Sequence, residues 1–113
     1  MAYDEGLAHR IRDAVAGEPG LDEKRMFGGL AFLVNGNLAV SASGQGGMLL
    51  RIDPADAETL TADPHVSRFR MRGRDMDGWL HVEPGAYDTD EALQRWVDTG
   101  VAYARSLPAK VDR

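Results

Sequence analysis

The sequence predicts an α+β domain in which antiparallel strands pack against helices. Two observations carry this prediction. Apolar residues recur with helical spacing near both ends of the chain, and short apolar runs joined by glycine-rich turns lie between them. With 113 residues the chain suits one domain, and no Pro-, Gly- or Ser-rich linker divides it. We therefore expect a single domain over residues 1–113, with a polar tail from about 109 to 113.

The first element is expected to be a helix from about Tyr3 to Ala16. Leu7, Ile11 and Val15 recur at a spacing of four residues and form one apolar stripe. Acidic residues stand in the first turn, where the helix dipole favours negative charge. The Gly-Glu-Pro-Gly segment at 17–20 then ends the helix.

A three-stranded antiparallel meander is predicted next, over 30–34, 37–43 and 48–52. Asn35-Gly36 suits a two-residue hairpin turn, because both residue types tolerate positive φ. A second glycine-rich turn occupies 44–47. The segment Lys24 to Phe27 is expected to begin the first strand, which would bend at Gly28-Gly29, as a bulge or a close backbone approach.

The rest of the chain is predicted to form a short helix, a β-hairpin and a last helix. Asp53-Pro54 is a helix-start pair, and the short helix is expected to reach about Ala62. The hairpin would join strands 68–72 and 79–83 through a loop at 73–78. The last helix is expected to start near Asp88, with a capping box to Glu91, and to end near Leu107 before Pro108.

Strand registers follow from the turns. The Asn35-Gly36 turn would pair Leu33 with Leu38 and Ala31 with Val40, and would extend this core face to Leu50 and Ile52. The opposite face would then carry Leu30, Phe32 and Leu49, which are also apolar. A sheet with one solvated face should alternate polar and apolar residues. We therefore expect the second face to be covered, either by the helix that contains Trp96 or by a self-association contact with a second copy or a protein partner.

Arginines are concentrated in the predicted second hairpin. Symmetric closure of its loop would pair Arg72 with Trp79, Arg70 with His81 and Arg68 with Glu83, with Arg74 just beyond. One interpretation is a solvated outer face, with a weak Arg68–Glu83 ion pair and Arg72 on the Trp79 ring. The other is a guanidinium row that binds an acidic protein surface or phosphates. Lys24, Arg25 and Arg51 would join that row in a surface for small anionic ligands or nucleic acid.

Composition excludes several classes of function. The chain has no cysteine, so neither disulfides nor Cys-based metal sites are available. No apolar run approaches the roughly 18–20 residues of a membrane span, and the acidic N-terminus is unlike a secretion signal, so we expect a cytoplasmic protein with no membrane partner. A net charge of −5 argues against binding nucleic acid by bulk charge.

No catalytic or metal-binding pattern is visible. His9, His65 and His81 show no ligand spacing, and no serine stands in a nucleophile-elbow motif. The Gly44–Gly47 segment lacks the Lys-Ser/Thr of a phosphate-binding loop. We expect no metal, no cofactor and no enzymatic activity.

The segment Lys24-Arg25-Met26-Phe27-Gly28-Gly29 resembles the N-terminal domain family of the TfoX/Sxy proteins. Other stretches agree with the family in order and spacing over roughly residues 5–110. They are Phe32–Asn37, Met48–Arg51, the positions Phe69, Met71, Gly73 and Gly78-Trp79, and Ala104–Pro108.

The resemblance implies a fold of helix, antiparallel strands, helix, β-hairpin and helix, similar to secretion-chaperone-like domains. The best-known family members regulate natural competence as transcriptional co-activators alongside a cyclic-AMP receptor protein. It implies no enzymatic chemistry and no cofactor. Those regulators carry a second, C-terminal domain, whereas this sequence ends at Arg113. We therefore expect a stand-alone regulatory domain that acts through protein–protein contacts, with a transcriptional regulator as partner.

Overall fold

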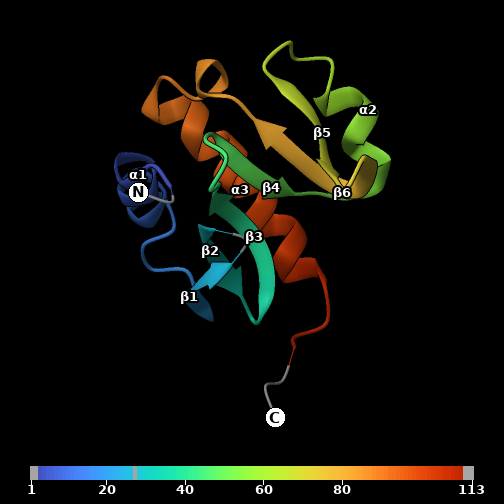
Figure 1. Ribbon diagram of the computed structural model, residues 1–113. Helices are drawn as coiled ribbons and strands as arrows, with labels where there is room; N and C mark the ends of the chain where they lie inside the picture. Colours follow the sequence, from blue (N-terminus) through green and yellow to red (C-terminus); the bar gives the residue numbers. More distant parts are fainter. Residues whose placement is uncertain (1–2, 27, 111–113) are drawn as a thin grey trace.

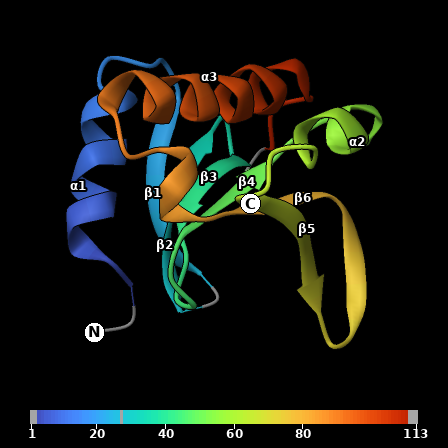
Figure 2. The same cartoon turned by 90° about the horizontal axis from the view of Figure 1, so that it is seen from above.

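A computed structural model of the chain describes residues 3–26 and 28–110. It is an α+β structure in which one antiparallel six-stranded sheet, in the order β1-β2-β3-β4-β6-β5, packs against two helices (Figure 1). Helices α1 and α3 lie on the same side of the sheet, and the β5–β6 hairpin projects away from them (Figure 2). The elements are α1 (Glu5–Ala14), β1 (Leu21–Met26), β2 (Gly29–Val34), β3 (Asn37–Ala42), β4 (Met48–Arg51), the 3-10 turn η1 (Pro54–Asp56), α2 (Ala57–Leu60), β5 (Val66–Met71), β6 (Arg74–Val82), the 3-10 turn η2 (Pro84–Ala86) and α3 (Asp90–Ser106).

The helices form where the apolar stripes predict them. Helix α1 begins after Asp4, whose side chain accepts a hydrogen bond from the Leu7 N–H at 3.1 Å. Helix α3 begins two residues later than expected. Thr89, rather than Asp88, is its N-cap, because the Thr89 hydroxyl accepts the Ala92 N–H at 3.1 Å. The short helix after Asp53 begins as η1 and ends at Leu60, before Ala62.

The predicted bend at Gly28-Gly29 is wrong. Residues 21–26 form a separate strand, β1, that pairs antiparallel with β2, so the meander has four strands. Gly28 has a φ of +76° at the reversal, which glycine adopts readily. Phe27 lies outside the described residues. The close approach expected here is confirmed at Gly29, where a Cβ would collide with the Ala42 carbonyl oxygen.

The turn between β2 and β3 is confirmed, but the register beyond it is not. Asn35 and Gly36 both have positive φ, and Leu33 lies opposite Leu38 as predicted. A one-residue bulge follows, and it places Phe32, not Ala31, opposite Val40. The bulge exchanges the two faces of β2: Leu30 and Phe32 face the helices, while Ala31 and Leu33 face away. The predicted pairing of Val40 with Leu50 is confirmed.

The second hairpin differs most from the prediction. Its turn is Arg72-Gly73, both with positive φ, and Met71 lies opposite Arg74. Of the expected loop at 73–78, residues 74–78 are therefore strand. The predicted pairings of Arg68, Arg70 and Arg72 are wrong. The ladder is irregular between Arg68, opposite Leu80, and Arg70, opposite Asp75. Several β6 residues, among them Gly78, form a bulge at this point. The prediction assumed that the two strands pair residue for residue from the loop, and it therefore could not include a bulge.

The core lies between the sheet and helices α1 and α3. Ile11, Phe32, Leu50, Leu80 and Val97 are fully buried in it. Helix α3 crosses the sheet at Gly100, where a Cβ would collide with the Ala39 carbonyl oxygen. The buried Asn37 side chain ties β3 to the end of α3, since it donates to the Ala104 and Pro108 carbonyl oxygens at 3.4 and 3.0 Å. Because α1 and α3 both pack on this side of the sheet, the opposite face carries neither of them.

Candidate functional site

The sheet face opposite the helices carries an apolar cluster, which we call the helix-free face. Three of its residues are buried, and four are partly exposed around them. They are Ala31, Leu38 and Leu49, surrounded by Met26, Leu33, Phe69 and Trp79. Within the described ranges no helix residue belongs to this cluster. The helix-free face spans the sheet from edge strand β1 to edge strand β5.

The self-association face predicted from Leu30, Phe32 and Leu49 is wrong in two of its three residues. Phe32 is fully buried and Leu30 is 7% exposed, both under the helices. Only Leu49 lies on the helix-free face. The bulge opposite Phe32 is the physical reason, because it inverts β2 relative to the expected register.

The alternative cover, the helix that contains Trp96, lies on the other side of the sheet. Trp96 packs against the main core, and its Nε1–H donates to the Ala86 carbonyl oxygen at 3.1 Å. A second apolar face is thus confirmed, but its residues differ and the last helix does not cover it.

The Arg51 guanidinium lies near two aromatic rings. Its guanidinium carbon is 5.4 Å from the centroid of Trp79 on β6 and 5.9 Å from that of Tyr103 on α3. The predicted stack of Arg72 on Trp79 is wrong, since Arg72 lies in the hairpin turn. Arg51 of β4 is the residue opposite Trp79. Among the residues that the structure describes, no hydrogen bond or ion pair engages the Arg51 guanidinium. Its N–H donors therefore remain available for a carboxylate or a phosphate.

The hairpin arginines do not form a row on one strand face. Arg68 and Arg70 belong to β5, Arg72 is in the turn and Arg74 is on β6. The Arg70 guanidinium is occupied: its Nε lies 3.5 Å from Asp75 Oδ1, and its Nη2 donates to the Gly73 carbonyl oxygen at 2.9 Å. Arg70 therefore stabilises the turn, and the tip of the hairpin has mixed charge.

Lys24 and Arg25 lie far from the hairpin in the sheet order. Both are exposed on β1, and β1 and β5 are the two opposite edges of the sheet. The structure therefore does not assemble Lys24 and Arg25 with the hairpin arginines in one anion-binding surface. Of the Lys24–Gly29 motif, the first three residues are in β1 and Gly29 begins β2.

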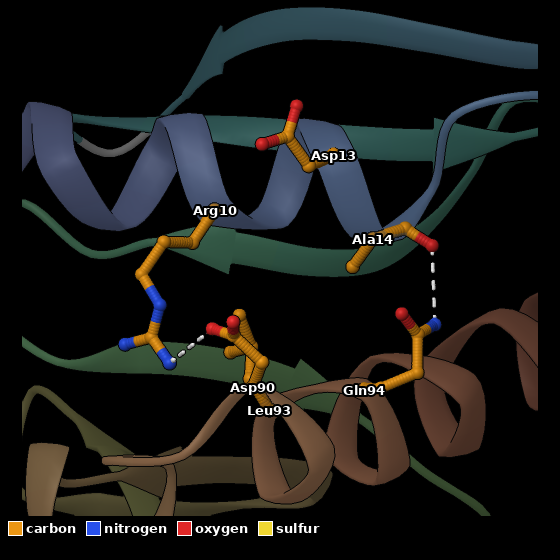
Figure 3. A pocket seen from close by; sticks show the side chains of 6 residues that line it. All are labelled: Arg10, Asp13, Ala14, Asp90, Leu93 and Gln94. Atoms are coloured by element: carbon orange, nitrogen blue, oxygen red, sulfur yellow. Dashed lines mark hydrogen bonds and ion pairs between the residues drawn. The ribbon is translucent and has the colours of Figure 1, made fainter.

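A shallow pocket between α1 and α3 was not foreseen from the sequence (Figure 3). Arg10 Nη2 donates to the Tyr87 carbonyl oxygen at 2.9 Å and lies 3.4 Å from Asp90 Oδ1. Gln94 Nε2 donates to the Ala14 carbonyl oxygen at 3.1 Å. These polar groups satisfy one another across the helices, so the pocket is a structural brace. No local sequence motif predicts this pocket, because its residues come from α1 and α3 and meet only in the folded chain.

Tyr87 lies beside this pocket with a perturbed phenol. Burial raises the pKa of Tyr87 to about 12; the Asp4 charge adds to the shift and the Arg10 charge opposes it. The guanidinium of Arg10 also lies 5.8 Å from the Tyr87 ring centroid. The residue is 4% exposed and belongs to the core, which favours a structural role.

The histidines remain apart, on α1, in the turn before β5 and on β6. His81 Nε2 lies 2.8 Å from the Gly46 carbonyl oxygen, which connects β6 to the turn before β4. Over residues 3–26 and 28–110, no three His, Asp or Glu side chains gather closely enough to hold a metal ion. No helix in the same ranges is long and apolar enough to cross a membrane.

Comparison with known protein families gives a match. The family model of the TfoX N-terminal domain matches residues 13–104, from the end of α1 almost to the end of α3. No curated protein and no solved structure matches the chain.

Proposed function

The chain belongs to the TfoX N-terminal domain family, and we propose that it is a non-enzymatic regulatory domain that binds a protein partner through its helix-free face. The observation that carries the proposal is the partly exposed apolar ring of that face: Met26, Leu33, Phe69 and Trp79. An antiparallel sheet with one face in the core ordinarily turns polar side chains to water on the other. A contiguous apolar patch in that place favours a contact surface.

The composition of the face also suits protein recognition. Aromatic residues, Met and Arg are enriched at interfaces between proteins, whereas Lys, Glu and Asp are depleted. Phe69, Trp79 and Met26 supply the apolar and aromatic area, and Arg51 supplies a guanidinium held against a ring. The partner that complements this surface presents an apolar side chain flanked by a carboxylate, because the Arg51 donors stand beside the apolar cluster.

The test is affinity capture from nuclease-treated host lysate with three forms of the chain. The face variant is Leu33→Ser with Phe69→Ser, and both changed side chains are partly exposed. The matched control is Arg95→Ser with Ala102→Ser, which changes two exposed positions on α3. We expect wild type and the control to retain the same proteins and the face variant to lose them. Retention by the face variant, with a native circular-dichroism spectrum, contradicts the proposal.

A second candidate function is the binding of single-stranded nucleic acid or a small anion at Arg51. It is favoured by one guanidinium near two aromatic rings, because single-strand binders combine cationic and aromatic side chains. Titration with single-stranded and duplex oligonucleotides tests it. Binding through phosphates should weaken steeply with salt and be lost in Arg51→Met. Binding that Arg51→Met leaves intact excludes this site.

A further inference from the structure

Strand β1 leaves one edge of the sheet unpaired. It spans six residues, and among the residues that the structure describes it pairs with β2 alone, in a continuous register. Its four central residues are exposed. The Glu23 N–H points to this edge, since the ladder alternates from the Asn35–Gly20 bond. It donates to the Asp22 carboxylate at 2.9 Å, a side-chain bond that an incoming strand would replace. An open edge of this length is a template for another strand.

The charges along this edge alternate in sign on each face of the strand. Asp22 and Lys24 lie opposite Leu33 and Ala31, on the side of the helix-free face. Glu23 and Arg25 lie opposite Phe32 and Leu30, on the side of the helices. Each side thus carries one acid and one base, two residues apart.

Symmetry limits how two copies of this edge can pair. Two antiparallel strands related by a two-fold axis require an axis perpendicular to the sheet, so each residue faces one on the same side. An axis through Glu23 places Asp22 opposite Lys24 of the second copy, and Lys24 opposite its Asp22. Opposite charges in directly facing positions stabilise a strand pair.

The charges at the axis are already compensated. The two Glu23 side chains would face each other, but each accepts hydrogen bonds from its own Arg12 at 2.8 and 2.9 Å. An axis through Lys24 instead would set Glu23 opposite Arg25 twice, but Glu23 is already bonded to its own Arg12. That axis would also oppose two lysines and set Asp22 against Met26. The other edge, β5, carries Arg68 and Arg70 and no acidic residue, so two copies of it offer no facing pair of opposite charges.

We propose that two copies of this chain pair antiparallel through β1, with Asp22 opposite Lys24 twice about a two-fold axis at Glu23. The pairing forms one continuous sheet, and the helix-free faces of both copies lie on the same side of it. The assignment does not rest on partner binding: it stands on the edge strand and its charges alone.

Charge reversal tests the register. Asp22→Lys makes the facing positions basic, and Lys24→Asp makes them acidic. We expect each variant to lower the self-association constant at least about tenfold, which corresponds to about 1.4 kcal/mol. An equimolar mixture of the two variants should associate, and the exchanged variant Asp22→Lys with Lys24→Asp should recover the wild-type constant. Arg68→Asp on the opposite edge is the control and should leave the constant unchanged.

Sedimentation velocity over a concentration series measures these constants, and circular dichroism checks the fold of each variant. Wild type that stays monomeric up to its solubility limit overturns the proposal. It is equally overturned by single reversals that associate as well as wild type, or by an exchanged variant that does not recover. A dimer that responds only to changes on the helix-free face assigns self-association to that face instead.

Discussion

Arg12 and Glu23 join helix α1 to the edge strand β1 through two charge-assisted hydrogen bonds. Arg12 Nε donates to Glu23 Oε2 at 2.8 Å, and Arg12 Nη2 donates to Glu23 Oε1 at 2.9 Å. A bidentate pair of this kind fixes direction as well as distance. It secures the strand proposed for self-association to the helical layer.

The Arg12–Glu23 pair predicts an acid-dependent contribution to stability. The hydrogen bond from Arg12 lowers the pKa of the Glu23 carboxyl, with burial opposing the shift and the Arg12 charge adding to it. A lowered folded-state pKa contributes stability above the unfolded-state pKa, and this contribution is lost as pH falls through the folded value. Wild type should therefore exceed Glu23→Gln in urea midpoint at pH 7, and the difference should shrink towards pH 3. A difference in urea midpoint between wild type and Glu23→Gln that stays constant with pH contradicts the ion pair. The control variant is Glu91→Gln, at an exposed position.

Tyr87 predicts a loss of stability at alkaline pH. Its pKa is raised to about 12, mainly by burial, so the folded state holds the phenol proton more tightly than the unfolded chain does. The contribution is complete below the unfolded-state value near 10 and is lost as pH rises through the folded value. The urea midpoint should fall more between pH 9 and pH 12 in wild type than in Tyr87→Phe. Equal falls in the two proteins would show that Tyr87 does not titrate as a buried group.

Gly100 predicts a packing limit between α3 and the sheet. A Cβ there would collide with the Ala39 carbonyl oxygen and lie 2.7 Å from Leu50 Cδ1. Gly100→Ala should destabilise the fold by about 1–3 kcal/mol, although alanine raises helix propensity, because backbone atoms would have to move. Chemical denaturation of wild type and Gly100→Ala measures this change in the free energy of unfolding. A stabilised Gly100→Ala would place α3 farther from β3; Ala102→Gly, exposed on the same helix, should cost about 1 kcal/mol and calibrates the propensity effect.

The two sheet faces should respond differently to truncation. Leu50 is fully buried, so Leu50→Ala should cost about 2–5 kcal/mol. Phe69 is only partly buried on the helix-free face, so Phe69→Ala should cost clearly less. Urea unfolding of both variants compares the two costs. A cost for Phe69→Ala equal to that for Leu50→Ala would mean that this face is as tightly packed as the core.

Local patterns in the sequence predict most of the fold. The stripe through Leu7 and Ile11, the Asn35-Gly36 turn and the Asp53-Pro54 start each depend on a few neighbouring residues. The α+β class follows from the same patterns. The family was expected from the resemblance at Lys24–Gly29 and the stretches that agree with it, and the family model confirms it. The separate strand β1 was missed because its four central residues are charged and give no apolar alternation.

The candidate site is less predictable, because it depends on two irregular registers. One residue added in β3 opposite Phe32 exchanges the faces of β2. The β6 bulge near Gly78 removes Trp79 from the predicted pairing with Arg72, while the separate ladder with β4 places Trp79 opposite Arg51. The sequence around each bulge contains no motif that predicts it, only an alanine in β3 and a glycine in β6. The Arg10–Asp90 contact joins residues 80 positions apart and depends on tertiary packing alone.

The most direct test of the helix-free face is methyl NMR of the labelled chain, titrated with a protein purified by the capture experiment. We predict that the Met26 and Leu33 methyl signals and the Trp79 indole signal shift on binding. The signals of Ala92 and Ala102, on α3 at the other side of the sheet, should stay in place. Shifts confined to the helices, with Met26, Leu33 and Trp79 unchanged, would contradict a binding surface on this face.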